Sequence, residues 1–205
     1  MIEIDVIKHI KNDRHKFELQ VNTVFQTGKM TKILGPSGVG KTTLLKILAG
    51  LIHPESGQIN VSGTVWFDGT KRYNLPTQKR NVGFVFQDYA LFPNMTVAEH
   101  LRFGTNDSSY LQQLLLLGEL EMHGDYFPNQ LSGGQQQRLA ILRALSTRPK
   151  LVLMDEPFSA LDHKLKSRML PALMNLFAEQ GTTVLLVTHN PAELPDADIF
   201  DFEEA

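Results

Sequence analysis

The sequence predicts an α/β fold with a mixed core sheet, an N-terminal antiparallel β-subdomain and an inserted helical subdomain. Residues 30–51 pass from a buried strand through a glycine-rich turn into a helix, as βα units do. Residues 1–34 and 57–67 contain short strands separated by turns. Residues 88–130 carry helical patterns and no strand pattern. We therefore expect one domain over residues 1–205, with a helical insertion at about 88–130.

The composition limits what the chain can do. With 205 residues, of which 42% are apolar and 20% charged, the chain can bury a full core as one domain. A net charge of −2 provides no basic field, so no nucleic-acid partner is expected. The lack of cysteine excludes a disulfide framework and thiolate metal sites, and fits a reducing compartment. The densest apolar run, Leu114–Leu117, is far too short to span a bilayer, so a membrane role requires a partner.

The N-terminal third reads as strands and turns. Residues 1–6 alternate like a strand and lack the apolar core of a signal peptide. A turn at 11–14 precedes a second alternating segment at 17–21, and Gly28 closes another turn. With the strands at 57–67, these segments predict an antiparallel sheet that flanks a parallel core.

The glycine-rich turn fits the phosphate-binding loop pattern of Gly, four residues and Gly-Lys-Ser/Thr. Glycines let backbone N–H groups approach phosphate oxygens. Lys41 supplies a cation for the β- and γ-phosphates, and the Thr42 hydroxyl can ligate Mg²⁺. An ordinary glycine-rich turn is the alternative, but the strand before it and the helix at 41–51 favour phosphate binding at a helix N-terminus. The predicted phosphate-binding residues are Gly35, Pro36, Ser37, Gly38, Val39, Gly40, Lys41, Thr42 and Thr43.

The helical insertion has recognisable helix boundaries. Thr96 and Glu99 have capping-box spacing and open a helix that runs to about Phe103. Residues 107–117 have helical periodicity and stop at Gly118. We interpret the leucine run in this second helix as core packing, with a special surface as the alternative.

A second glycine-containing stretch, Leu131-Ser132-Gly133-Gly134-Gln135, opens a helix that continues through Leu145. Ser132 and Gln135 have capping-box spacing, so Ser132 is the predicted N-cap. Two glycines in a first turn lower helix propensity. They are explained if an anionic group must approach that backbone closely; a flexible loop-to-helix junction is the alternative.

Two acids, Asp155 and Glu156, follow the buried strand 151–154. Ligands of parallel α/β sheets bind at the carboxyl ends of the strands. Asp155 can hold the same Mg²⁺ that Thr42 touches, and Glu156 can polarise a water for attack on the γ-phosphate. The alternative role, capping of the next helix, explains one acid better than two.

Polar residues also follow two other buried strands. Gln87 comes after the strand 82–86, and His189 comes after the strand 182–187. A lone histidine is usually structural, but the shared sheet edge favours a phosphate contact for His189.

The last elements are a long helix and a short strand. Asp162 leads into a helix through Phe177, which Pro171 is expected to kink or divide in two. Gly181 ends this helix, and residues 199–202 are expected to add a final strand.

Together these motifs resemble an ATP-binding cassette (ABC) ATPase, and the resemblance covers essentially the whole chain. The Leu-Ser-Gly-Gly-Gln stretch between the phosphate loop and the Asp-Glu pair is highly specific. Residues 91–99, with Leu75-Pro76 and Lys79-Arg80, look most like ATPase subunits of bacterial importers for molybdate, sulfate, polyamines, iron or sugars.

The resemblance implies roles for the residues of the sheet edge. The phosphate loop would wrap the phosphates of ATP, and Thr42 and Asp155 would hold Mg²⁺. Gln87 would sense Mg²⁺ and the attacking water and would link the site to the helical insertion. Glu156 would be the general base, and His189 would contact the γ-phosphate.

The resemblance also implies a composite site. Ser132, Gly133, Gly134 and Gln135 would contact ATP bound to a second ABC ATPase subunit, and Asp162 would lie at the subunit boundary. One chain is therefore not expected to form a complete site.

The chain departs from the family pattern in three respects. The family stacks adenine on an aromatic residue in the first β-loop; Arg14, His15 and Phe17 are available here, and Phe17 is our choice, with a core position as its alternative. The helical insertion is short. The chain also ends soon after His189, so no C-terminal regulatory domain is expected.

The implied mechanism is ATP-driven closure of a dimer, most simply a homodimer, beneath transmembrane permease subunits. Tyr89, Phe92 and Phe103 could line the docking groove, with core packing as the alternative. The expected location is the cytoplasmic face of the inner membrane, through the permease. An exporter subunit and a soluble non-transport ABC ATPase remain alternatives. A P-loop kinase or GTPase would leave the Leu-Ser-Gly-Gly-Gln stretch unexplained.

Overall fold

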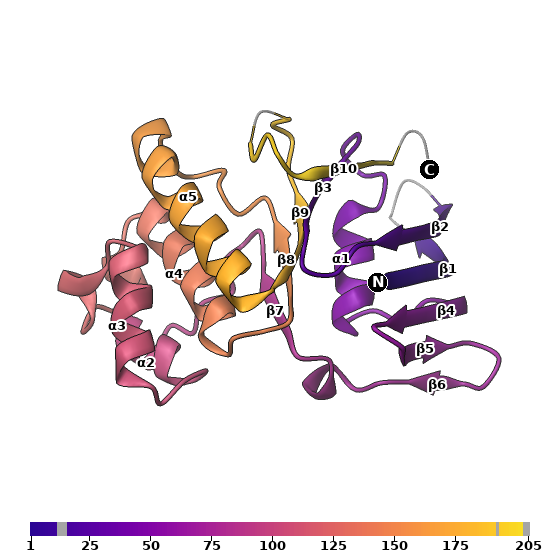
Figure 1. The fold of residues 1–205 in the computed structure, drawn as a ribbon, viewed down its shortest axis with the longest axis horizontal. Coiled ribbons are helices and arrows are strands. Elements are labelled where there is room, and N and C mark those ends of the chain that lie inside the picture. Colours follow the sequence, from indigo (N-terminus) through magenta and orange to yellow (C-terminus); the bar gives the residue numbers. More distant parts are fainter. Residues whose placement is uncertain (12–15, 192, 203–205) are drawn as a thin grey trace.

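The computed structural model describes residues 1–11, 16–191 and 193–202. Its strands form two five-stranded sheets, one antiparallel and one parallel, with helices around them (Figure 1). This arrangement confirms the predicted α/β class, with an antiparallel N-terminal part and helices inserted between strands of the parallel sheet.

The antiparallel sheet has the order β2-β1-β4-β5-β6. Its strands alternate between buried apolar and exposed polar side chains, the pattern of a sheet with one solvated face. The strands are β1 (Ile2–Lys11), β2 (Lys16–Phe25), β4 (Ser56–Val61), β5 (Thr64–Asp68) and β6 (Tyr73–Asn74).

The parallel sheet has the order β10-β3-β9-β8-β7. Its central strands β8 and β9 are buried along their whole length, as expected of a parallel sheet covered on both faces. The strands are β3 (Met30–Leu34), β7 (Val82–Val85), β8 (Leu151–Asp155), β9 (Thr183–Val187) and β10 (Asp198–Asp201). Ile33 and Asp155 both pair with Val187, so the carboxyl ends of β3, β9 and β8 lie level.

The helices follow the predicted boundaries closely. Thr96, Asp107, Ser132 and Asp162 are N-caps whose side chains accept backbone N–H bonds of the first turns. The α-helices are α1 (Lys41–Ala49), α2 (Val97–Arg102), α3 (Ser108–Leu117), α4 (Gly133–Ser146) and α5 (His163–Gln180), and the 3-10 helices are η1 (Thr77–Lys79), η2 (Glu121–His123) and η3 (Pro128–Gln130).

Pro171 does not divide its helix, so this alternative of the prediction is wrong, and the kink stays a prediction. Helix α5 runs unbroken through Pro171, whose side chain is exposed. Met169 before the proline and Leu173 after it are both buried in the same hydrophobic cluster. Packing of both halves on one core therefore outweighs the local helix-breaking effect of proline.

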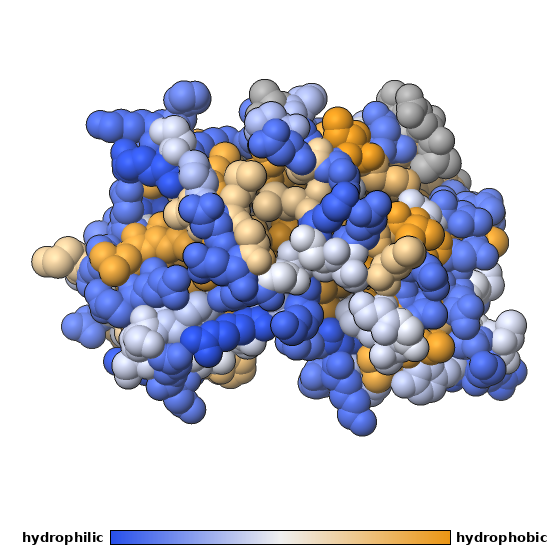
Figure 2. All heavy atoms as spheres, in the orientation of Figure 1, coloured by the Kyte–Doolittle hydropathy of each residue, from blue (hydrophilic) through white to orange (hydrophobic). Residues whose placement is uncertain are grey.

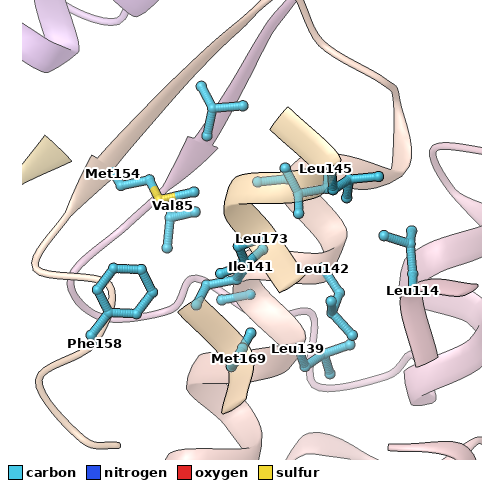
Figure 3. Close-up of a cluster of buried hydrophobic side chains, with 14 of the residues drawn as sticks. Val85, Leu114, Leu139, Ile141, Leu142, Leu145, Met154, Phe158, Met169 and Leu173 are labelled. Carbon is cyan, nitrogen blue, oxygen red and sulfur yellow. The ribbon is translucent and has the colours of Figure 1, made fainter. Parts of the chain in front are cut away.

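Two hydrophobic clusters hold the layers together. Helix α1 lies between the parallel strands and the antiparallel sheet (Figure 1), and its buried face joins side chains from both sheets. On the other face of the parallel sheet, α4 and α5 contribute Ile141, Leu145, Met169 and Leu173 to a cluster with β7 and β8 (Figure 3). Polar side chains cover most of these helices on the face shown in Figure 2. The two clusters therefore pack against both faces of the parallel sheet and support its edge.

Candidate active site

The phosphate-loop residues form a tight turn between β3 and α1. Gly40 is the N-cap of α1 with φ of 113°, a left-handed conformation that favours glycine. A Cβ at Gly40 would also lie 2.9 Å from the Leu19 side chain, so only glycine fits against the antiparallel sheet here. This conformation sets the first turn of α1 at the sheet edge, where its free N–H groups face an anion site.

Lys41, the first residue of α1, is buried within the turn. Its Nζ donates to the carbonyl oxygens of Gly35 and Pro36, at 2.6 Å each. Burial lowers the Lys41 pKa, and the nearby carboxylates of Glu156 and Asp155 oppose that shift. The ammonium is thus held inside the loop at the position predicted for a phosphate-binding cation.

A cavity of about 360 Å³ opens against this loop. Its volume lies in the range of small-molecule sites. Elements far apart in the sequence contribute to it: β1, β2, the phosphate loop, and the residues after β7, β8 and β9. The lining residues are Ile10, Phe17, Ser37, Gly38, Gly40, Lys41, Thr42, Thr43, Gln87, Glu156, Val187 and His189. The structure therefore brings the predicted phosphate loop, Gln87, Glu156 and His189 into one site.

Asp155 and Glu156 stand at the end of β8 in different environments. Asp155 is 3% exposed and borders a cavity together with Thr42. Burial raises the pKa of Asp155, and the nearby Thr42 hydroxyl opposes that shift. Glu156 has φ of 49°, uncommon for a non-glycine residue, and its N–H donates to the Val187 carbonyl at 3.0 Å. The backbone turn separates the surroundings of the two adjacent carboxylates.

Gln87 lines two adjoining cavities. The second, of about 540 Å³, is bordered also by Thr42, Lys46 and Asp155. Gln87 thus sits beside the Thr42–Asp155 pair in one cavity and beside Glu156 in the other. Sequence reasoning did not identify Lys46, one turn along α1 from Thr42.

His189 lies beside Glu156, and Glu193, which follows it in the chain, is bonded to α5. Its Nε2 lies 3.1 Å from Glu156 Oε1. The Thr188 hydroxyl donates to Glu193 Oε2 at 2.8 Å, and Lys166 Nζ of α5 donates to Glu193 Oε1 at 2.8 Å. This buried carboxylate therefore fixes the segment that presents His189. No sequence pattern predicted the Lys166–Glu193 pair, which depends on tertiary packing.

Phe17 borders the main cavity and also packs against the hydrophobic cluster around α1. The position of Phe17 is compatible with both adenine stacking and core packing, so adenine stacking on Phe17 stays a prediction. The other two candidates, Arg14 and His15, lie outside the described residues.

The Leu-Ser-Gly-Gly-Gln stretch lies apart from this cavity. Within the described part of the chain, neither cavity that the phosphate loop borders includes residues 132–135. Ser132 and Gln135 form the predicted capping box: Gln135 N donates to Ser132 Oγ at 3.3 Å, and Ser132 N donates to Gln135 Oε1 at 2.7 Å. Asp162 accepts from Leu165 N at 2.8 Å and is exposed. These residues form a second group, in which Ser132, Gly133 and Asp162 are exposed and Gly134 and Gln135 are partly buried.

Gln137, two residues beyond this stretch, was also missed by sequence reasoning. It is buried, and its side-chain amide bonds to the segment that follows β8. The sequence did carry a signal, since Gln137 stands four residues before buried Ile141 on the core-facing side of α4.

Comparison with known families and proteins agrees with this geometry. A family model described as "ABC transporter" matches residues 19–159. A model described as "AAA domain, putative AbiEii toxin, Type IV TA system" matches residues 127–194.

Several curated proteins are similar to the chain. A probable sulfate/thiosulfate import ATP-binding protein of Chlorella vulgaris is 44% identical over 182 residues, which cover 85% of this chain and 75% of that protein. A spermidine/putrescine import ATP-binding protein of Thermotoga maritima is 43% identical over 91% of this chain and 52% of its own length. An Fe(3+) ions import ATP-binding protein of Pseudomonas fluorescens is 45% identical over 81% of this chain and 48% of its own length. The chain thus spans about half the length of the last two relatives.

Among solved structures, the dimeric post-hydrolysis state of the ATP-binding cassette MJ0796 bound to ADP and Pi is similar, with a TM-score of 0.83 and 32% identity. The match covers 98% of this chain and 94% of that chain. The family match, the identities and the fold lead to one conclusion: the chain belongs to the ABC transporter family, as an ATP-binding cassette.

Proposed function

We propose that the chain binds and hydrolyses ATP as the nucleotide-binding subunit of an ABC importer, over one domain with a helical insertion at about 88–130. The observation that carries this proposal is the cavity in which Lys41, Gln87, Glu156 and His189 meet at the carboxyl ends of parallel strands. The names of the relatives support import: they are import ATP-binding proteins for sulfate, polyamines and iron.

The phosphate loop holds the triphosphate. Its backbone N–H groups and the N-terminus of α1 take the phosphate oxygens, and Lys41 leaves the carbonyls of Gly35 and Pro36 to pair with the β- and γ-phosphates. Phe17, at the rim of the cavity, stacks on the adenine.

The oxygen ligands around Thr42 fit Mg²⁺. Thr42, Asp155 and Gln87 border one cavity and offer it a hydroxyl, a carboxylate and an amide oxygen. The described residues contain no cluster of three His, Asp or Glu side chains suited to a metal ion, which agrees with a cation held partly by substrate phosphates and water. Bound there, Mg²⁺ would neutralise charge on the phosphate oxygens.

Hydrolysis needs a base beside the γ-phosphate. Glu156 accepts a proton from water while the water oxygen bonds to the γ-phosphorus, and the bond from phosphorus to the bridging oxygen breaks to leave ADP. His189, 3.1 Å from the Glu156 carboxylate, contacts the γ-phosphate and orients the base. Lys41 offsets the charge that develops on the leaving oxygens.

Completion of the site needs a second subunit. Ser132, Gly133, Gly134 and Gln135 lie apart from the cavity of their own chain and, with the exposed Asp162, are free to meet a facing copy. The similar cassette MJ0796 is dimeric, which supports a homodimer with two composite sites.

An apolar groove supports docking to a permease. A cavity of about 350 Å³ is bordered by Phe84, Phe86, Phe92 and Phe103, with Arg143 at its side. Phe103 is 71% exposed. Tyr89 was also predicted in the groove, but it packs against the hydrophobic core instead. No helix of the described residues is both long and apolar enough to cross a bilayer. Attachment to the cytoplasmic face of the inner membrane would therefore run through the groove.

Lys41→Ala tests the proposal, because it removes the cation placed on the β- and γ-phosphates. ATP binding should weaken strongly and phosphate release should become undetectable, while the circular dichroism spectrum stays that of the wild type. Lys71→Ala, at an exposed lysine of the β5–β6 turn, should keep wild-type turnover. Near wild-type turnover of folded Lys41→Ala would exclude Lys41 from the site.

A further inference from the structure

Gln137 is a fully buried glutamine that does not line the cavity of the proposed site. It is 1% exposed, and it lies in α4 two residues after the Leu-Ser-Gly-Gly-Gln stretch. A buried side-chain amide must satisfy both its N–H groups and its oxygen. The partners of Gln137 all belong to one short segment, residues 156–160.

The contacts are specific. Gln137 Nε2 donates to the Glu156 carbonyl at 3.3 Å and to Ser159 Oγ at 3.1 Å. Gln137 Oε1 accepts from Ala160 N at 2.9 Å. A Cβ at Gly134 would lie 3.3 Å from the Ala160 carbonyl oxygen, so the first turn of α4 sits close against the same segment.

This segment begins with the proposed general base. Glu156 has a left-handed backbone, φ 49°, that surrounding contacts must maintain. Its N–H donates to the Val187 carbonyl, and its own carbonyl accepts from Gln137 Nε2 and from the N–H and hydroxyl of Ser159. These bonds clamp the peptide groups on both sides of the Glu156 Cα and so direct its side chain into the cavity.

The same glutamine lies in the helix whose N-terminus carries the exposed stretch 132–135. We propose that Gln137 is a positioning residue, which aligns Glu156 and couples the exposed N-terminus of α4 to the hydrolytic site of its own chain. Contact of that N-terminus with nucleotide on a facing subunit would then adjust the base of the site behind it. The inference rests on the proposed ATPase function and adds communication between its two sites.

Gln137→Met tests the inference, because methionine keeps the length of the side chain but makes no amide bonds. We expect kcat for ATP to fall about tenfold, with the dissociation constant for a fluorescent ATP analogue within about twofold of the wild-type value. Gln136→Met is the matched control. Gln136 is the preceding residue of α4, and its amide donates to the Pro128 and Leu131 carbonyls at 2.9 and 3.1 Å instead. Its kcat should stay within about twofold of wild type.

Two further variants separate positioning from a general structural role. In a Glu156→Gln background the base is already lost, so Gln137→Met should not lower the residual rate further. Ser159→Ala removes an exposed hydroxyl that bonds both Gln137 Nε2 and the Glu156 carbonyl, so it weakens the same anchoring of Glu156 without risk to the core and should lower kcat modestly at unchanged ATP affinity.

The outcomes are distinct. Wild-type kcat in both Gln137→Met and Ser159→Ala would overturn the inference, as would equal losses in Gln136→Met and Gln137→Met or an undiminished effect in the Glu156→Gln background. If Gln137→Met does not fold, the Ser159→Ala rate decides. Absence of turnover by the wild-type dimer would instead overturn the proposed function, and the inference with it.

Discussion

At the scale of single residues, the site separates two adjacent carboxylates by environment. Asp155 is buried against Thr42, and burial raises its pKa. Glu156, one residue further, lies at the cavity beside His189. Different environments let neighbouring acids take different roles, as we propose for Asp155 as a cation ligand and Glu156 as a base.

The raised pKa of Asp155 predicts a pH-dependent cost to stability. The folded protein binds this proton more tightly than the unfolded chain, so the free energy of unfolding falls as pH rises from the ordinary value of 3.8 through the raised folded pKa. Asp155→Asn removes the buried charge and keeps an oxygen that can accept from Thr42. Its melting temperature should therefore exceed that of the wild type at pH 7 to 8, by about 2–4 °C for each kcal/mol gained.

The advantage of Asp155→Asn should disappear at the acid end of the titration, where the wild-type aspartate is protonated in both states. Scanning calorimetry across this range measures the difference, and Asp125→Asn at an exposed position should show little shift. A lower melting temperature of Asp155→Asn at pH 8 would mean that attraction to Lys41 and Lys46 exceeds the cost of burial.

At the scale of elements, local signals predicted most of the fold. Capping residues such as Thr96 and Asp107 act within one helical turn, so their patterns mark helix starts in sequence and structure alike. The local effect of Pro171 did not predict the course of α5, because core contacts on both sides of the proline decide whether the helix continues. In the site, strand ends placed Gln87, Glu156 and His189 correctly at one edge. The spacing of Gln137 to Ile141 signals its burial, but its partners, like those of Glu193, depend on tertiary packing that no local pattern reveals.

Arg80 is another residue whose role only packing reveals, because the sequence places it in a polar loop. It is 3% exposed, burial lowers its pKa to about 10, and its guanidinium lies 5.3 Å from the Trp66 ring. It donates to the carbonyls of Ile47 and Leu48 at 2.8 Å each, and so caps the C-terminus of α1.

Arg80→Met should therefore destabilise the protein by roughly 2–4 kcal/mol, because it removes a buried group that donates to the Ile47, Leu48 and Leu75 carbonyls. Urea unfolding followed by circular dichroism measures the loss. Lys79→Met, at the exposed neighbouring position, should change the midpoint little. Equal midpoints for the two variants would remove Arg80 from the anchoring of α1.

At the scale of the whole molecule, the predicted functional residues fall into two separate groups and a groove. The cavity group lies at the sheet edge, the Leu-Ser-Gly-Gly-Gln group lies at the N-terminus of α4, and the phenylalanine groove lies beside β7. The N-terminus of α4 and the groove beside β7 are both available for contact with another chain.

Phe103→Asp tests the groove, because a charge there should oppose docking of an apolar permease segment. The exposed ring of Phe103 can be replaced without opening the core. We expect ATPase activity of the isolated subunit to persist while co-purification with its permease is lost. Met122→Asp, at a side chain 87% exposed on η2 and outside the groove, should co-purify normally. Undiminished association of Phe103→Asp would place the docking surface elsewhere.

The proposed composite site predicts that a variant unable to hydrolyse ATP forms a stable dimer. Glu156→Gln keeps the size of the base and most of its hydrogen bonds but cannot accept the proton, which typically costs about 10²–10⁴ in rate. Asp155 and Thr42 still hold the cation, so ATP still binds. Because reopening depends on loss of the γ-phosphate contacts, the closed state should accumulate. Size exclusion with light scattering should show a dimer with Mg²⁺-ATP and a monomer with ADP.

Adding Ser132→Arg should abolish this dimer. Ser132 is exposed at the N-cap of α4, so the larger side chain blocks the approach of the helix N-terminus to phosphate on the facing subunit without disturbing the core. A dimer that survives in the double variant would exclude residues 132–135 from the contact with nucleotide in trans. A monomer of Glu156→Gln under every nucleotide condition would instead mean that closure requires a different cassette subunit or the permease itself.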